Sequence, residues 1–150
     1  MGGICEVVAA DESVAANVAV LTDACIAAFG QMDVLHYKAE IVEVGGPVKT
    51  TEKSWDRVND GKLKSMCLTC KQVLPHMQRR PMARSSTLHR CRISAGSRSP
   101  TFPECGDQAA VIQFTRVIVL QYARLGVRAN TILPGMMNTP MVHAPSVIAA

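Results

Sequence analysis

Residues 107–135 read DQAAVIQFTRVIVLQYARLGVRANTILPG and give the clearest indication of the fold. Asp107 is a suitable N-cap for an apolar helix over residues 108–125, and Gly126 is a suitable residue to end that helix. Residues 127–133 then read as a strand, which Pro134 and Gly135 close. A helix that leads directly into a short apolar strand is typical of one half of a βαβ unit.

The N-terminal half repeats this alternation of strand and helix. Residues 7–10 predict a short buried strand, residues 13–29 a helix that Gly30 ends, and residues 33–36 a second strand. A longer helix is predicted from Thr51, its N-cap, to the neighbourhood of Pro75, with Trp55 as a core anchor. Strands and helices at this spacing predict a single α/β domain with a parallel sheet.

Two parts of the chain depart from this pattern. Residues 78–107 are rich in Arg, Ser, Pro and Cys and are expected to be irregular, with a strand conceivable only over residues 88–93. The arginines there lack the interleaved aromatic residues of a nucleic-acid-binding surface, so no nucleic-acid partner is expected. Residues 136–150 either form a mobile tail or cover a substrate pocket with their methionines.

Composition limits the class of protein further. The chain has 150 residues, 48% of them apolar and only 4% aromatic, and a net charge of +4, so one domain with an aliphatic core is expected. The first residues lack the features of a signal peptide, and no apolar run is long enough to span a bilayer, so no membrane partner is expected. Six cysteines without a secretion signal predict reduced thiols and a cytoplasmic location.

Cys67 and Cys70 form a C-x-x-C pair that has two interpretations. Such a pair can bind zinc together with further histidines or cysteines. Structural zinc pairs usually sit on turns, however, and this pair falls in the middle of a predicted helix. We therefore expect the two cysteines to pack on the apolar side of that helix, and we expect no metal.

Several blocks together resemble the classical short-chain dehydrogenase/reductase family, and their order and approximate spacing match it. These blocks are Phe29-Gly30-Gln31-Met32-Asp33-Val34-Leu35, Trp55-Asp56-Arg57-Val58, Val73-Leu74-Pro75-His76-Met77, the segment 109–116, Gly126-Val127-Arg128-Ala129-Asn130-Thr131 and Pro134-Gly135. The resemblance implies a Rossmann-like, doubly wound parallel sheet that lacks the family's N-terminal βαβ unit with its Gly-rich loop. The chain would then be a truncated and degenerate member, in which the strand at residues 34–36 lacks its usual neighbour.

The resemblance also implies a cofactor, NAD or NADP, and a small-molecule substrate with an alcohol or carbonyl group. Asp11 is similar to the family's residue near the adenine ring, and Ala39 lies in a segment similar to the one beside the cofactor. Pro134, Gly135 and Thr139 match the segment that contacts the nicotinamide, and Ser94 matches the catalytic serine. These are the expected cofactor-binding and catalytic residues.

The remaining catalytic positions of the family hold other residues in this chain. Lys62 stands at the family's asparagine and Cys105 at its tyrosine, while the lysine is either deleted or replaced by Gln108. Neither Cys nor Gln reproduces the tyrosine and lysine pair, because a thiol is a different acid and an amide carries no charge. We therefore expect an oxidoreductase by ancestry that transfers no hydride. The alternative is a non-catalytic homologue that forms homo- or hetero-oligomers through the helices at residues 55–77 and 108–125.

Overall fold

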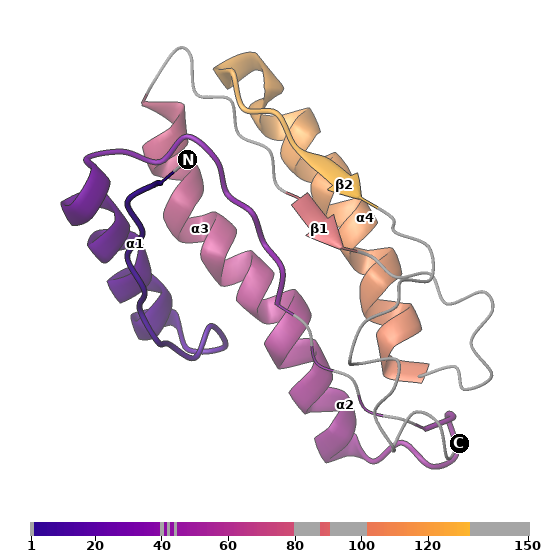
Figure 1. Cartoon of the computed structure of the whole chain (residues 1–150). Coiled ribbons are helices and arrows are strands. Elements are labelled where there is room, and N and C mark those ends of the chain that lie inside the picture. The colour runs from indigo at the N-terminus through magenta and orange to yellow at the C-terminus, as the bar shows by residue number, and fades with distance from the viewer. Residues whose placement is uncertain are drawn as a thin grey trace.

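The computed structural model describes residues 2–39, 41, 43, 45–79, 88–90 and 102–132. Side chains are described for these residues except 88–90, 102–105 and 108. Its helices α1, α3 and α4 lie next to one another as a layer, with extended segments and a short sheet in front of them (Figure 1). This layer is built around the central helix, which has α1 on one side and α4 on the other (Figure 1).

The central helix is continuous and consists of three segments, two α-helical and one π-helical. It consists of α2 (Glu52–Asn59), a π-helical turn (Asp60–Lys64) and α3 (Ser65–Gln78). The predicted N-cap is confirmed, because the hydroxyl of Thr51 accepts a hydrogen bond from the backbone N–H of Ser54 at 3.1 Å. Pro75 lies in the last turns of α3, as predicted.

Helix α1 (Ala15–Phe29) confirms the predicted helix in the N-terminal half. Gly30 ends it in the left-handed conformation, with φ of 72°, and its N–H bonds the carbonyl of Ile26 at 2.8 Å. Glycine adopts this conformation without the steric cost that a Cβ brings. The sequence position of Gly30 therefore fixes where the chain leaves α1.

A βαβ unit forms the other side of the layer. Strand β1 (Leu88–Arg90) pairs in parallel with β2 (Asn130–Ile132), with Leu88 opposite Asn130 and Arg90 opposite Ile132. Helix α4 (Phe102–Tyr122) connects the two strands and is followed by a 3-10 turn (Ala123–Leu125). Gly126 closes that turn with φ of 80°, so its predicted role is confirmed. The predicted parallel sheet is present as this pair.

Several predicted boundaries are wrong. Residues 7–10 and 33–36 are extended but form no strand, and Val7 and Val34 are 86% and 58% exposed. Both segments have strand-like sequences, but neither has a neighbouring strand among the described residues to which it could hydrogen-bond. Asp107 is not an N-cap, because α4 begins five residues earlier, at Phe102. The expected irregular stretch 78–107 therefore includes β1 and the first turns of α4.

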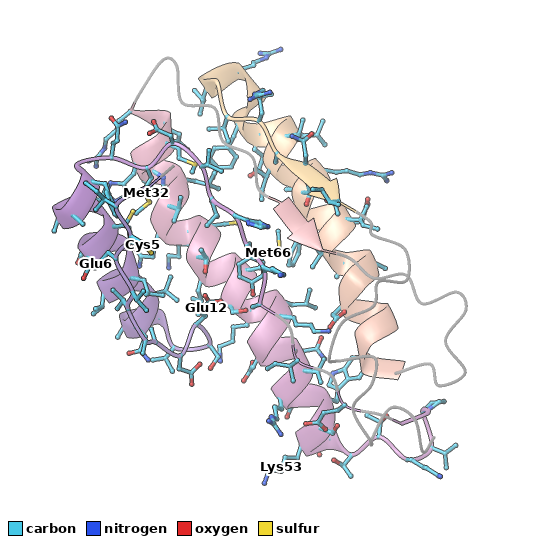
Figure 2. The ribbon with its side chains drawn as sticks, in the orientation of Figure 1. Cys5, Glu6, Glu12, Met32, Lys53 and Met66 are labelled. Carbon is cyan, nitrogen blue, oxygen red and sulfur yellow. The ribbon has the colours of Figure 1, made fainter. Side chains whose placement is uncertain are left out.

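The core lies where the central helix meets α4 and the segment that leads into β2. It is formed by Tyr37, Met66, Cys70, Val73, Leu74, Met77, Val111, Ile118, Val127 and Ala129. Figure 2 shows Met66 between the central helix and the βαβ unit, whereas Lys53 points away from the body. Trp55 is 39% exposed, so the prediction that it anchors the core is wrong.

Replacement of Gly30 by Ala tests how α1 ends. The new methyl group meets no atom within 4 Å, so the cost is that of a positive φ alone, about 1–2 kcal/mol of unfolding free energy. Gly46→Ala is the matched control, because Gly46 also has open space around it but no positive φ. Urea unfolding followed by circular dichroism measures both variants. Equal stability of the two variants would contradict the assigned conformation of Gly30.

Candidate functional site

The structure describes only two of the six predicted site residues. Asp11 is exposed, and its Oδ1 accepts hydrogen bonds from the hydroxyl of Ser13 at 2.6 Å and from the N–H of Ser13 at 2.9 Å. These two bonds, the hydroxyl first, lower the pKa of Asp11 below its ordinary value. Ala39 is half-buried and packs against the core. Ser94, Pro134, Gly135 and Thr139 lie outside the described residues.

The helix N-termini whose caps are described do not fit the pyrophosphate of a dinucleotide. A pyrophosphate needs free backbone N–H groups and positive potential at a helix N-terminus. Asp11 and Glu12 precede α1, and Asp11 already binds an N–H at this end. At α2, Thr51 caps the helix and Glu52 occupies its first turn. Carboxylates stand at the N-termini of both α1 and α2 and repel a phosphate, so neither helix end suits the pyrophosphate of NAD or NADP.

Glu43 adds to the negative charge at the start of α2. Its carboxylate accepts a hydrogen bond from the hydroxyl of Ser54 and pairs with Arg57, with 3.1 Å between Oε1 and the guanidinium nitrogen. The Arg57 side chain is 69% exposed, so this ion pair contributes little to stability. At the start of α2, Glu43, Ser54 and Arg57 therefore interact with one another.

A buried ion pair connects the central helix to α4. Nζ of Lys62, on the π-helical turn, lies 3.1 Å from Oδ2 of Asp107. The two side chains are only 3% and 0% exposed. A buried charge is strongly unfavourable unless an opposite charge faces it, so each residue requires the other. Lys62 is the residue that the family resemblance places at the asparagine.

A second polar cluster covers the same turn of the central helix. Ser65 donates a hydrogen bond to the carbonyl of Gly61 at 2.7 Å, and the hydroxyl of Tyr37 donates one to the carbonyl of Lys62 at 3.1 Å. The two hydroxyl oxygens of Tyr37 and Ser65 also contact each other, so one of the two protons is shared between this contact and a carbonyl. A π-helical turn displaces carbonyls from their usual i+4 partners, and these hydroxyls satisfy two of them. Tyr37 is buried, and its hydroxyl contacts the backbone of this turn and not the solvent.

The spacing of the sequence contained a signal for the buried pair that our prediction did not use. Lys62 lies four residues after Val58 and four before Met66, all three of which are buried. Asp107 lies four residues before Val111, and both of these residues are buried as well. A charged residue in register with an apolar helix face is expected to be buried and paired.

The cysteines whose side chains the structure describes are free thiols: Cys5, Cys25, Cys67 and Cys70. Cys70 is buried, and loss of water around it raises the pKa of its thiol to about 11. Cys67 is exposed, so only one member of the C-x-x-C pair packs on the apolar side, contrary to our expectation for both. No group of three or more metal-ligating side chains occurs within the described residues.

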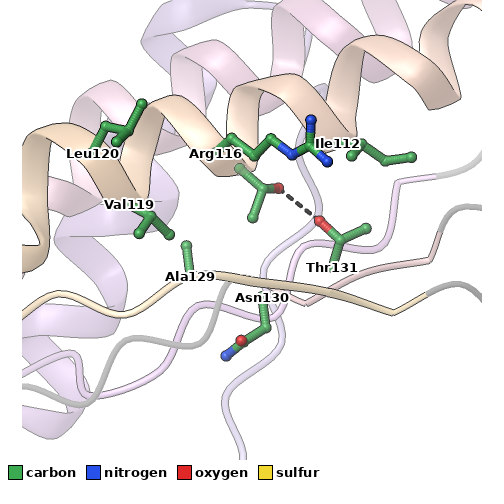
Figure 3. Close-up of a pocket in the computed structure, with 8 residues that line it drawn as sticks. Ile112, Arg116, Val119, Leu120, Ala129, Asn130 and Thr131 are labelled. Atoms are coloured by element: carbon green, nitrogen blue, oxygen red, sulfur yellow. Dashed lines mark hydrogen bonds between the residues drawn. The ribbon is translucent and has the colours of Figure 1, made fainter.

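An open cavity of about 530 Å³ lies between α4 and β2, as Figure 3 shows. Ile112, Val119, Leu120 and Ala129 form most of its wall, with Arg116 beside them. Thr115 and Thr131 also line it, and Thr131 donates a hydrogen bond to Thr115 at 2.9 Å that connects β2 to α4. Neither Asp11 nor Ala39, the two predicted site residues that the structure describes, lines this cavity.

Within the described parts of the chain, no helix is long and apolar enough to cross a membrane.

A parallel strand pair joined by a covering helix, with two further helices in the same layer, belongs to the Rossmann-like class of α/β domains. A family model described as enoyl-(acyl carrier protein) reductase matches residues 2–148. The chain belongs to the short-chain dehydrogenase/reductase family. This confirms the resemblance and the fold class predicted from the sequence.

Relatives and solved structures support this assignment. The 3beta-hydroxysteroid dehydrogenase 1 of Eggerthella lenta is 32% identical over 145 residues, which cover 93% of this chain and 54% of the relative. The 2-keto-3-deoxy-L-fuconate dehydrogenase of Xanthomonas campestris is 34% identical over 119 residues, which cover 78% of this chain and 39% of the relative. A crystal structure described as a short-chain dehydrogenase/reductase of Burkholderia xenovorans is 28% identical and matches with a TM-score of 0.83. The match covers 91% of this chain and 54% of the Burkholderia chain. The chain thus spans about half the length of such relatives.

Replacement of Lys62 by Met tests the buried ion pair. The variant leaves the Asp107 carboxylate buried without its cation, and we expect a loss of about 3–5 kcal/mol in unfolding free energy. The double variant Lys62→Met with Asp107→Leu recovers most of that loss, because no buried charge is left. Lys64→Met is the control, since Lys64 forms an exposed pair with Asp60 and its loss costs at most about 0.5 kcal/mol. A Lys62→Met variant as stable as the Lys64→Met variant would contradict burial of the pair.

Alkylation with iodoacetamide tests the different environments of the two cysteines on α3. At pH 8 about one Cys70 thiol in a thousand is ionised, because the pKa is about 11, and its burial slows reaction further. Peptide mass spectrometry is expected to show Cys67 modified at least about tenfold faster than Cys70. The rates converge in denaturant. Equal rates in the folded protein would show that Cys70 is accessible.

Proposed function

We propose that this chain descends from NAD(P)-dependent oxidoreductases of alcohols and carbonyls and transfers no hydride itself. The observation that carries this proposal is the buried pair of Lys62 and Asp107. The residue at the family's asparagine position is a cation held in the interior by a carboxylate of α4. It contributes to the packing of two helices, and its amine faces the carboxylate of Asp107.

The environment of the cofactor supports the same proposal. Asp11 resembles the family's residue near the adenine ring and Ala39 lies in the segment beside the cofactor, but the acidic groups before α1 and at the start of α2 oppose a pyrophosphate. The sequence offers Cys105 and Gln108 in place of the tyrosine and lysine. NAD or NADP would therefore bind this chain weakly at most. The free thiols of the described residues favour a cytoplasmic location.

A second function, association through the helices, has its own supporting observation. Helix α4 exposes Phe114, Val117 and Leu120, and Leu120 is 83% exposed. Trp55 on α2 is exposed as well. Large exposed apolar residues on the central helix and α4 favour contact with another copy or with an intact relative. In this second function the chain is a non-catalytic protein that associates with another copy of itself or with an intact relative.

Hydride transfer is tested by following NADH and NADPH at 340 nm with the purified chain and a panel of ketones and aldehydes. We expect no consumption above a blank without protein. Restoring Lys62 to Asn in the same chain is expected to leave this result unchanged, because the acid and base residues are still replaced. Turnover by the unaltered chain that rises with its concentration would overturn the proposal.

Association is tested by size-exclusion chromatography with light scattering over a range of protein concentrations. We expect dimers or larger species, and we expect Leu120→Glu to weaken them at least about tenfold, because it places a charge on the apolar face. Val48→Glu is the control, since Val48 is 97% exposed and lies in the turn before α2. A chain that stays monomeric, alone and with an intact relative, would rule this function out.

A further inference from the structure

A second cavity, of about 390 Å³, lies between α1, α3 and the extended stretch that follows α1. The side chains that form most of its wall are apolar: Val18, Leu21, Met32, Leu35 and Val73. Its volume is within the range of cavities that hold a small molecule. None of the described residues that line it also lines the cavity between α4 and β2. It is therefore a separate candidate site for a ligand.

The charged residues that line this second cavity are both acidic. Glu12 precedes α1 and Asp33 follows it, and no lysine, arginine or histidine lines the cavity among the described residues. Asp33 accepts a hydrogen bond from the side chain of Gln31 at 2.7 Å. The cavity therefore combines an apolar wall with a negative potential, which favours a cation and disfavours an anion.

Two polar atoms of the lining residues are buried without a hydrogen-bond partner. They are Oε2 of Glu12 and Oγ1 of Thr69, which belongs to α3. Figure 2 shows Glu12 beside the central helix. The hydroxyl of Thr22, which also lines the cavity, differs from them because it donates to the carbonyl of Val18 at 3.0 Å. A buried carboxylate oxygen is costly until a donor or an opposite charge faces it, so Glu12 requires a donor from the occupant of the cavity.

We propose that the second cavity binds a primary aliphatic amine, with its ammonium group at Glu12 and its hydrocarbon chain along the apolar wall. An ammonium group has three donors and no acceptor, so it supplies a partner to the carboxylate oxygen and has donors left for a hydroxyl such as that of Thr69. Its charge compensates that of the half-buried Glu12. Each methylene group of the chain that leaves water for the apolar wall adds to the affinity.

Other donors match these residues less well. Calcium and magnesium ions take six or more oxygen ligands, and no group of three or more metal-ligating side chains occurs in the described residues. A guanidinium group is a planar fork of five donors, and an apolar wall offers most of them no acceptor. A neutral alcohol supplies a donor but leaves the charge of Glu12 uncompensated. The ammonium group therefore fits the cavity best.

The test is an NMR titration of the isotope-labelled full chain at neutral pH with three ligands of equal chain length. Hexylamine carries the ammonium group, 1-hexanol has no charge, and hexanoate has the opposite charge. We expect hexylamine to shift the amide signals of Leu21, Thr69 and Val73 and to bind at least about tenfold more tightly than 1-hexanol. Hexanoate is expected to leave these signals unchanged, because it would bring a second carboxylate to Glu12.

Chain length gives an independent measurement on the apolar wall. Butylamine has the same ammonium group as hexylamine and a shorter chain. It is expected to bind about fivefold more weakly, because fewer methylene groups leave water.

A matched pair of variants locates the ammonium group. Glu12→Gln and Glu6→Gln both remove a carboxylate from the N-terminal segment, but Glu6 is exposed and does not line the cavity. Glu12→Gln is expected to weaken hexylamine binding at least about tenfold and to leave 1-hexanol binding within about twofold. Glu6→Gln is expected to leave both within about twofold. Circular dichroism checks that both variants are folded.

Three results would overturn the proposal. The first is failure of hexylamine to bind, or its binding with shifts confined to residues away from the cavity. The second is binding of 1-hexanol or hexanoate as tight as that of hexylamine. The third is equal affinity of folded Glu12→Gln and Glu6→Gln for hexylamine. The comparison of ligands uses the unaltered chain, so it decides the question even if Glu12→Gln does not fold, and it is independent of the hydride-transfer and chromatography experiments.

Discussion

Burial of one face of the central helix is the constraint on which the other elements depend. Met66, Cys70, Val73, Leu74 and Met77 of α3 all belong to the core, and α1 and the segment after it pack against this helix. Burial of a large aliphatic side chain contributes about 1.5–3 kcal/mol, so this face supplies much of the favourable energy in a chain with few aromatic residues. Helix α4 completes the core with Val111 and Ile118. The parallel strands are short, and they take their position from the helices behind them.

The polar interactions follow from the same packing. The π-helical turn brings Lys62 to the side of the central helix that faces α4, where Asp107 meets it. Tyr37 and Ser65 satisfy carbonyls that this turn displaces. Together these residues make a buried polar junction in which each member has a partner, and such junctions specify one arrangement of helices more than they add stability. The family fold is thereby kept while Lys62 has a packing role, since a fold does not by itself imply a function.

Local signals in the sequence predicted the helices and their ends well. Gly30, Thr51 and Gly126 have the predicted roles, because backbone conformation and capping depend on a few neighbouring atoms. Strand predictions at residues 7–10 and 33–36 failed, because a strand exists only with a partner, and partners are set by tertiary structure. Asp107 was misplaced as a cap because helix propensity alone did not show that α4 begins at Phe102. Of the site, the sequence identified Lys62 as a substituted position, but its pairing with Asp107 required coordinates for two distant helices.

We propose that the chain has the fold of a dinucleotide-dependent oxidoreductase without the means to use the dinucleotide. A thermal melt of the purified chain, alone and with millimolar NADH or NADPH, tests it most directly. A ligand that binds only the folded state must raise the melting temperature. We expect a melting temperature that neither nucleotide shifts, because acidic groups stand before α1 and at the start of α2. An upward shift that grows with nucleotide concentration would show a working cofactor site and contradict it.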